Sequence, residues 1–528
     1  MASVGVVDAA STNKKTPSET NNRPKKFYFG VFFDGTGNNM IQKEAAIQFR
    51  DSQRKAATQY KGAKTGAGST VSLQQENKDW ESEINHSLNR YGANDLKTDT
   101  LKDDGDYSNV AILHSVYQGL SPCDRQREAE NNDIYIYNIY VEGAGTGAIN
   151  RDSFAQDAFN TRGSGFGQGA TGVTALVGKA VKMVKVRLKG FDVTNAEVHF
   201  HISGFSRGAT CARLFSHLIV RKNGDPLPCE NEFSEYFEKD RFLHFLDNLP
   251  LKSKTVDFLG IFDTVSSIGL NYDNNVTDYG LFSPNEDGVK HTFHLCAMDE
   301  FRENFAITDI GNAVNKGNNA EIYIPGCHSD VGGGYITGTD TFFLSYPSQM
   351  FISDPQNSGG RRMMLEGQGD VLQWLGWFDG NNDTNRLVNH NKLKKIECTR
   401  IVNGGYNTIP LRMMGTRAKK DLGTDVFAMD AIGRARYSFP KRLQQCGAEM
   451  VSFAEKARGR HFYFPGNTYL YKSLRNRFLH FSATDQILSK HTRIVHNPNK
   501  AANNTICRIL YTGDNGNKTK RLLCDYNL

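Results

Sequence analysis

The sequence predicts an α/β fold in which a mostly parallel sheet is flanked by helices, with insertions and a C-terminal mixed region. Three observations support this prediction. Short apolar runs bounded by turn residues alternate with stretches of helical periodicity. Polar residues follow directly after several of the apolar runs, where open parallel sheets hold their sites. One apolar run, Ala196–Ile202, leads through a G-x-S-x-G pentapeptide into a helical stretch.

The predicted elements follow one another in the order that a parallel sheet requires. Strands are expected in five apolar runs, at residues 27–33, 132–147, 196–202, 253–265 and 320–335. Helices are expected at residues 108–120, 173–190 and 208–220, and Ser108 is a candidate N-cap for the first of them. Helical stretches between strands are typical of parallel connections.

The chain divides into three regions by composition. Residues 1–26 are polar and contain two prolines, which is typical of a disordered tail. Residues 27–345 are expected to form the catalytic domain, with a polar surface insertion at 41–106. Residues 346–528 have more isolated aromatics and Asn/Gly breaks, so we expect a mixed, partly helical region that could serve as a membrane-contacting or lid module.

Composition and charge exclude several classes of protein. The formal net charge is +6, from 63 basic and 57 acidic residues, and this small excess does not support nucleic-acid binding. It is compatible with weak attraction to an anionic membrane surface. The nine cysteines are scattered without metal-like spacing, which predicts mostly free, buried thiols of a reducing cytosol. With neither a signal peptide nor an 18-residue apolar stretch, the chain is expected to be made in the cytoplasm and exported, if at all, by other machinery.

The pentapeptide Gly204-Phe205-Ser206-Arg207-Gly208 is the pattern of a serine hydrolase nucleophile. A serine hydroxyl needs a base within hydrogen-bond reach, and the base needs an acid to hold its tautomer. In an α/β-hydrolase these groups follow different strands in the chain order serine, acid, histidine. Ser206, Asp263 and His328 meet this order, each at a predicted strand end.

Alternatives remain open for each residue of this set. Ser206 could be a helix N-cap, and Asp263 could cap a helix that begins at Thr264. Asp330 is the rival acid, although it lies only two residues from His328. The histidines that compete with His328 are His114, His294 and His480. His199 and His201 lie within the strand before Ser206 and are expected to be structural.

An oxyanion formed at Ser206 needs two backbone N–H donors. The first is expected from Arg207, directly after the nucleophile. The second is expected from Gly35 or Thr36 in the loop "FDGTGNN", for which a plain turn is the alternative interpretation.

Seven segments of the chain resemble ordered blocks of the α/β-hydrolase family that includes the type VI secretion lipase effectors, the Tle1 class. They are "FFDGTGNN", "SNVAILH", "GFSRGA", "FLGIFDTV", "CHSDVGGGY", "YNTIPLRMM" and "LRNRFLHFSA". The resemblance spans residues 27 to 483 and implies a phospholipase that cleaves acyl esters of membrane glycerophospholipids in the periplasm of competing bacteria. It also implies a spike or tube carrier protein and a cognate immunity protein, and it maps the family's triad onto Ser206, Asp263 and His328.

Other signals are weaker, and we expect no cofactor and no metal. The glycine loops "GAGTGA" and "GSGFGQGATG" lack the G-K-[ST] of a nucleotide loop, and "DGNNDTN" has its glycine in the wrong place for a calcium loop. The segment "LQWLGWF" at residues 372–378 is either a membrane contact or a core helix. A serine hydrolase of soluble esters, thioesters or peptides, and an inactive hydrolase fold that only binds, are the alternative functions.

Overall fold

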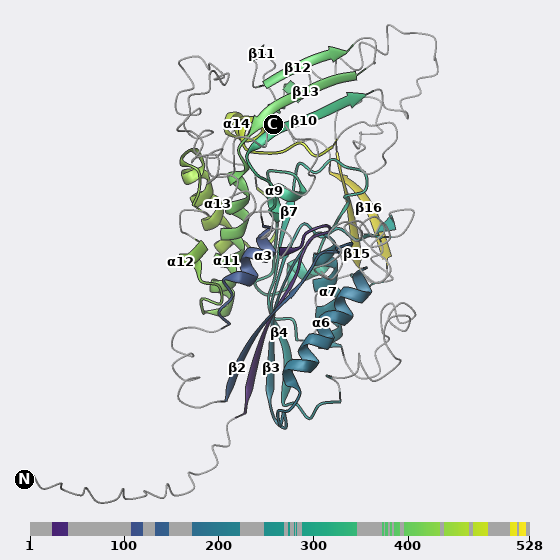
Figure 1. Ribbon diagram of the computed structural model, residues 1–528, viewed down its shortest axis with the longest axis vertical. Helices are drawn as coiled ribbons and strands as arrows, with labels where there is room; N and C mark the ends of the chain where they lie inside the picture. Colours follow the sequence, from purple (N-terminus) through teal and green to yellow (C-terminus); the bar gives the residue numbers. More distant parts are fainter. Residues whose placement is uncertain are drawn as a thin grey trace, which may run out of the picture.

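A computed structural model gives the structure of the protein (Figure 1). The residues that it describes are 24–40, 107–119, 133–146, 172–221, 246, 248–268, 273–274, 279, 281, 288–345, 372–373, 375–377, 381–382, 385–390, 395–432, 438–463, 468–483, 507–514 and 517–523. The expected insertion at 41–106 lies outside these residues, as do the loop "GSGFGQGATG" except for Gly172 and nearly all of the expected N-terminal tail.

A parallel sheet forms the centre of the described structure. Its strand order is β14-β9-β7-β4-β3-β1-β2, and every neighbouring pair is parallel. The strands are β1 (Lys26–Phe33), β2 (Ile134–Val141), β3 (Glu197–Phe205), β4 (Ser253–Phe262), β7 (Thr292–Ala297), β9 (Ala320–Ile324) and β14 (Gly459–Phe462). The predicted α/β class is therefore confirmed.

The central strands are apolar along almost their whole length because both faces of the sheet are covered. Along β1, Phe29, Val31 and Phe33 point into one hydrophobic core, whereas Phe32 points into the core on the other face. All four side chains are buried. The sequence therefore shows a continuous apolar run at β1 rather than an alternating one.

Helices cover both faces of the sheet (Figure 1). One face packs against α6 (Val173–Leu188) and α7 (Arg207–Val220). The other packs against α3 (Asn109–Ser115), α11 (Thr408–Leu422) and α13 (Gln444–Lys456). The predicted cap is present at α3, because the Ser108 hydroxyl accepts a hydrogen bond of 3.1 Å from the Ala111 N–H.

The described part of residues 346–528 is mixed, and it also contributes to the parallel sheet and to the helical layer on one of its faces. Helices α11 and α13 cover the sheet, and β14 pairs with β9 to extend it. A second, antiparallel sheet joins β10 (Gly338–Ser345), β13 (Lys395–Val402), β12 (Asn385–His390) and β11 (Asn381–Asn382). The C-terminal hairpin, β15 (Arg508–Asp514) and β16 (Asn517–Leu523), adds to β8 (Ile307–Thr308).

The remaining elements are short. They are β5 (Ser267–Ile268), β6 (Asp273–Asn274), α9 (His328–Gly332), α12 (Met429–Ile432), α14 (Thr468–Arg477) and the 3-10 helices Gly311–Asn315, Gly404–Asn407 and Lys441–Leu443. None of the helices in the described ranges is long and apolar enough to cross a bilayer.

The described residues of "LQWLGWF" belong to the core. Trp377 is fully buried, and Leu372 and Leu375 join the same hydrophobic cluster. The guanidinium groups of Arg400 and Arg475 lie 5.3 and 5.2 Å from the centre of the Trp377 ring. Of the two interpretations of this segment, the core one fits these residues.

Within the described ranges, the cysteines follow the expectation of mostly free, buried thiols, with one exception. Five described cysteines are free and buried: Cys211, Cys296, Cys327, Cys398 and Cys446. Cys507, at the start of the C-terminal hairpin, is in a disulfide instead. Spacing along the sequence does not predict this pairing, because a disulfide depends on contacts made in the fold.

Candidate active site

Ser206 lies between the end of β3 and the start of α7, in a strained backbone conformation with φ 60° and ψ −127°. Both glycines of the pentapeptide are needed for close packing. A Cβ at Gly204 would lie closer than 3.0 Å to the Gly208 carbonyl, and a Cβ at Gly208 equally close to the carbonyls of Phe33 and Asp34. Ser206 occupies the N-cap position of α7, but its side chain makes no capping hydrogen bond. Strain at a strand-to-helix turn is typical of a nucleophile elbow.

Asp263 follows β4, the strand next to β3, and it too has a positive φ, of 44°. The register pairs Phe205 with Phe262, so Ser206 and Asp263 leave neighbouring strands at the same edge of the sheet. The Ser206 N–H donates to the Phe262 carbonyl at 3.1 Å. The strand ends thus bring the predicted nucleophile and acid together.

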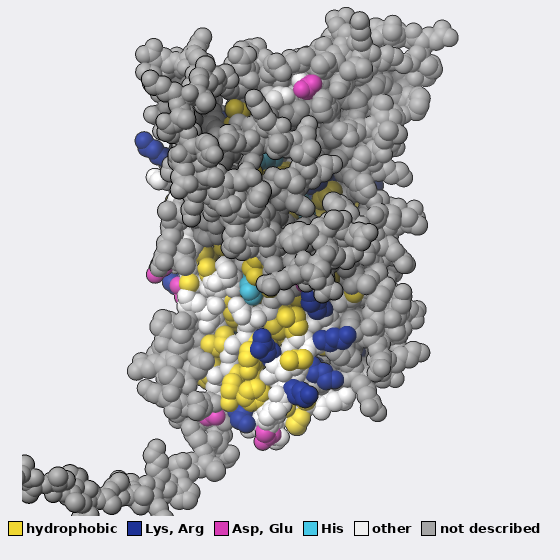
Figure 2. All heavy atoms as spheres, in the orientation of Figure 1, with side chains coloured by type: hydrophobic (Ala, Val, Ile, Leu, Met, Phe, Trp, Pro, Cys, Tyr) yellow, Lys and Arg dark blue, Asp and Glu magenta, His cyan; other side chains and the backbone are white. Residues whose placement is uncertain are grey.

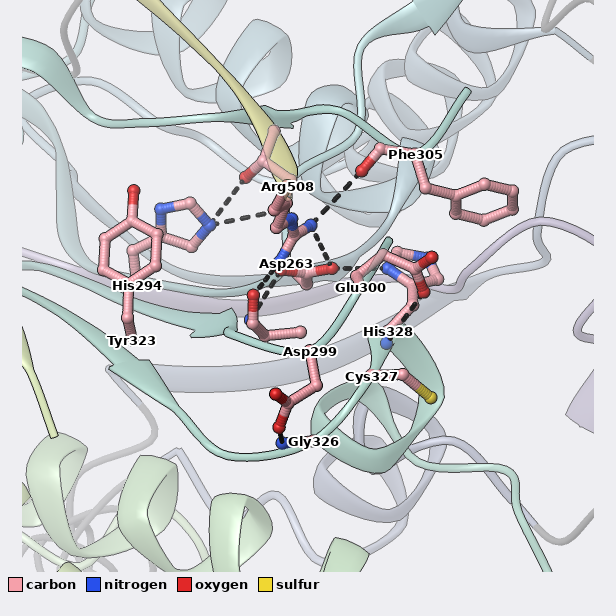
Figure 3. Close-up of polar contacts among 12 residues, drawn as sticks. Asp263, His294, Asp299, Glu300, Phe305, Tyr323, Gly326, Cys327, His328 and Arg508 are labelled. Atoms are coloured by element: carbon pink, nitrogen blue, oxygen red, sulfur yellow. Dashed lines mark hydrogen bonds and ion pairs between the residues drawn. The ribbon is translucent and has the colours of Figure 1, made fainter. Parts of the chain in front are cut away.

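His328 comes after β9, at the first position of α9. Its Nδ1 lies 2.6 Å from Asp263 Oδ2, and both side chains are buried (Figure 3). The imidazole also lies against the rings of Phe205 and Phe305, with centroids 4.5 and 5.1 Å away. His328 is therefore next to the residue that precedes Ser206, although no hydrogen bond between Ser206 Oγ and His328 is formed within the described residues. Catalytic hydrogen bonds are often long before substrate binds.

The environment favours an ionised acid and a neutral base. Burial raises the pKa of Asp263, but the positive charge of Arg508 and the hydrogen bond with His328 outweigh it and hold this pKa well below its usual range. Burial lowers the pKa of His328, and the Asp263 carboxylate only partly opposes that shift. A neutral imidazole whose Nδ1–H faces a carboxylate has its Nε2 available as a base.

The rival acid and histidines are engaged elsewhere. Asp330 accepts hydrogen bonds from the Cys327 N–H at 3.0 Å and from the His480 N–H at 2.9 Å, and its other oxygen lies 2.8 Å from His480 Nδ1.

His294 pairs with Glu321 at 2.9 Å. His199 and His201, expected to be structural, contact Asp257 and Tyr117 at 2.8 and 2.9 Å. The Nδ1 atom of half-buried His114 has no hydrogen-bond partner among the described residues.

The loop after β1 lies beside the start of α7, where the second oxyanion donor is expected. A Cβ on Gly35 would meet the Phe205 ring closer than 3.0 Å. The Gly35 N–H, however, already donates to Asp34 Oδ1 at 2.7 Å, so Thr36 is the better placed of the two candidate donors. Arg207 opens α7, and N–H groups of a helix's first turn point beyond the helix end.

Sequence reasoning missed several residues that surround the acid–base pair. Arg508 binds Asp263 through both terminal nitrogens, at 2.8 Å each. Glu300 accepts the His328 N–H at 3.2 Å and the Ser482 hydroxyl at 2.9 Å, and it forms two 2.8 Å bonds with Arg302. These contacts join segments far apart in the chain, and no spacing pattern marks them.

One group of buried side chains resembles a metal site. His294, Cys296 and Glu321 place their ligand atoms within 4.8 Å of one another. Both ring nitrogens of His294 are already engaged, Nδ1 with Glu321 and Nε2 as acceptor of the Thr264 N–H at 3.1 Å. A metal ion would have to displace these hydrogen bonds, so the structure gives the group a structural role.

Residues 94–353 match a family model that is described as the catalytic domain of Tle1-like phospholipase effectors of the type VI secretion system (T6SS). This segment, just under half of the chain, is similar to the catalytic domain of Tle1-like effectors. It contains Ser206, Asp263 and His328, whereas β1 with Gly35 and Thr36, and the hairpin with Arg508, lie outside it.

Two solved structures are similar to the chain. The first is the Tle1 effector bound to the VgrG spike from the type 6 secretion system, with 18% identity, 91% of this chain and 89% of that chain covered, and a TM-score of 0.48. The second is an uncharacterized protein from Pseudomonas aeruginosa, with 18% identity and a TM-score of 0.27. This similarity covers 59% of this chain and 42% of that chain. No curated protein matches the chain.

Proposed function

We propose that the protein is a serine phospholipase A that hydrolyses acyl esters of membrane glycerophospholipids through Ser206, Asp263 and His328. The observation that carries this proposal is the buried Asp263–His328 pair, joined at 2.6 Å beside a strained Ser206 at the end of β3. The match of residues 94–353 to the Tle1-like phospholipase effector family model supports the choice of substrate.

The proposed reaction has two halves. His328 Nε2 takes the proton of the Ser206 hydroxyl as Oγ attacks the ester carbonyl, and Asp263 stabilises the imidazolium that forms. The N–H groups of Arg207 and of Thr36 or Gly35 bind the oxyanion. His328 then gives its proton to the leaving lysophospholipid oxygen. In the second half, a water attacks the acyl-enzyme with His328 as base, and the fatty acid is released with Ser206 restored.

The biological setting is part of the same proposal. As an effector of the type VI system, the chain would be made in the producer's cytoplasm, carried by a spike or tube protein, and delivered to the periplasm of a target bacterium. A cognate immunity protein would protect the producer. The solved Tle1 effector bound to a VgrG spike illustrates one such carrier for that protein.

The first prediction is that Ser206→Ala abolishes fatty-acid release from phospholipid vesicles, by on the order of 10⁴- to 10⁶-fold, because the nucleophile is lost. The measurement is mass spectrometry of the released lipids, and the chain left on the lysophospholipid identifies the acyl position. A matched control is Ser203→Ala, which removes a buried hydroxyl from the same strand and should keep activity.

Three results would each contradict part of the proposal. Equal release by the wild type and Ser206→Ala would exclude a serine mechanism. A fluorophosphonate probe that labels neither protein would favour an inactive hydrolase fold that only binds. Much faster cleavage of a soluble nitrophenyl ester than of vesicles would keep the serine hydrolase but assign it a soluble substrate.

A further inference from the structure

Arg508 is the first residue of β15, and its guanidinium lies against the candidate acid (Figure 3). Nη1 donates to Asp263 Oδ1 and Nη2 to Asp263 Oδ2, each at 2.8 Å. Its other hydrogen bonds go to the carbonyls of Ala297 and Phe305. Both charged side chains are completely buried. A bidentate pair of this kind fixes the plane of the carboxylate.

The C-terminal hairpin is held so that Arg508 reaches this position. Strand β15 pairs in parallel with β8, with Leu510 opposite Ile307. The Asp309 N–H donates to the Tyr511 carbonyl at 3.1 Å, and the Thr512 hydroxyl donates to Asp309 Oδ2 at 2.7 Å. The hairpin is therefore anchored to the segment between β7 and β9, next to the strand end that carries Asp263.

The hydrogen bonds at Asp263 leave its carboxylate a single orientation. An ionised carboxylate offers about four acceptor positions. Oδ1 accepts from the Ala297 N–H at 2.8 Å and from Arg508, and Oδ2 accepts from Arg508 and from His328 Nδ1. Without Arg508, half of these bonds would be lost, and the plane of the carboxylate would be held only by the Ala297 N–H and His328 Nδ1.

Burial and Arg302 lower the pKa of His328, whereas Asp263 and Glu300 raise it. Arg508 acts on His328 through its ion pair with Asp263. A carboxylate that already shares a cation stabilises an imidazolium less than an unpaired carboxylate would. Loss of the Arg508 charge should therefore raise the pKa of His328. A residue with only a packing role would lower stability without this effect.

We propose that Arg508 is a positioning residue for the serine hydrolase reaction, holding Asp263 in place for His328, so that the C-terminal hairpin completes the active site. This inference rests on the proposed function for its effect on catalysis. The effect of Arg508 on His328 itself does not depend on the identity of the substrate.

The experiment compares the wild type with Arg508→Met, Arg508→Lys and Arg508→Gln in the full-length protein. Turnover on phospholipid vesicles is measured against pH, and His328 is titrated by NMR with ¹⁵N-labelled histidine. In Arg508→Met, kcat should fall roughly 10- to 1000-fold with little change in KM, which is less than the loss expected for the acid itself. The His328 midpoint should rise by about one pH unit. Arg508→Lys should keep the midpoint near that of the wild type.

Arg417→Met is the matched control, because Arg417 is another fully buried arginine paired with a carboxylate, Asp421. It should lower stability and leave the His328 midpoint unchanged. If Arg508→Met does not fold, Arg508→Gln provides the same test. An unchanged His328 midpoint in the folded variant would overturn the inference, even with reduced activity. If the wild type does not hydrolyse vesicles, the phospholipase proposal fails, while the NMR midpoint still decides the role of Arg508.

Discussion

Several carboxylates in the described structure contact a histidine, among them those of Asp263, Asp330 and Glu321. A carboxylate–histidine pair alone therefore does not identify the candidate base. The three pairs have similar lengths, 2.6 Å for His328, 2.8 Å for His480 and 2.9 Å for His294. What distinguishes the first pair is its place, because Asp263 leaves the strand next to Ser206 at the matching register position. Asp330 instead accepts the Cys327 N–H at the start of α9.

This difference predicts opposite results for two similar substitutions. Asp263→Asn should lower kcat by about 10⁴-fold, because an amide at this position favours the wrong tautomer of His328. Asp330→Asn should lower the thermal midpoint and keep activity within about tenfold, because Asp330 supports α9 rather than the base. Steady-state kinetics on vesicles, with a thermal melt of each variant, provide the comparison. If Asp330→Asn were the more damaging to kcat in a folded protein, the assignment of the acid would be wrong.

At the scale of elements, the turn from β3 into α7 depends on how closely α7 approaches β1. Gly208→Ala would ordinarily stabilise a helix by up to about 1 kcal/mol. Here the added methyl group would press against the carbonyls of Phe33 and Asp34, which are backbone atoms. We expect a net destabilisation of about 1–3 kcal/mol and a loss of activity, because the loop with the candidate oxyanion donors is displaced.

Urea unfolding and vesicle hydrolysis would test this prediction. Gly338→Ala is the control, since a Cβ at Gly338 would meet nothing within 4 Å. Gly208→Ala with wild-type stability and activity would mean that α7 can move away from β1 without consequence for the site.

The elements that were predictable from sequence are those with local signals. Apolar runs identify β1, β2, β3, β4 and β9, and the pentapeptide identifies the Ser206 turn with its two glycines. The central strand β7 is absent from the sequence prediction. Strand β14 has no such signal, because its residues are half-buried or exposed at the edge of the sheet. Arg508 lies 245 residues from Asp263, so its role depends on the docking of the C-terminal hairpin, which no local pattern reveals.

At the scale of the whole molecule, the exposed basic residues of α6 lie away from the candidate site. Figure 2 shows Lys and Arg side chains gathered over the described face that includes α6, where Lys182, Lys185, Arg187 and Lys189 are exposed. Helix α6 runs back along the parallel sheet, so its C-terminal half reaches the edge where the strands begin. Ser206 and Asp263 lie at the opposite edge. Attraction between this basic surface and an anionic membrane would not by itself bring the site to its substrate.

Protonation of buried His201 should couple the stability of the whole fold to pH. Burial lowers the pKa of His201 from 6.5 to about 4, and its Nδ1 lies 2.9 Å from the Tyr117 hydroxyl. Below pH 6.5 the His201 imidazole binds a proton in the unfolded chain but stays neutral in the folded protein. The free energy of unfolding therefore falls between about pH 6.5 and pH 4. The full difference corresponds to about 3 kcal/mol.

In His201→Gln this contribution disappears, and the loss of stability between pH 7 and pH 4.5 in urea unfolding should become smaller than in the wild type. His461→Gln, on strand β14, should keep the wild-type dependence, and an unchanged slope in His201→Gln would show that other groups control acid unfolding.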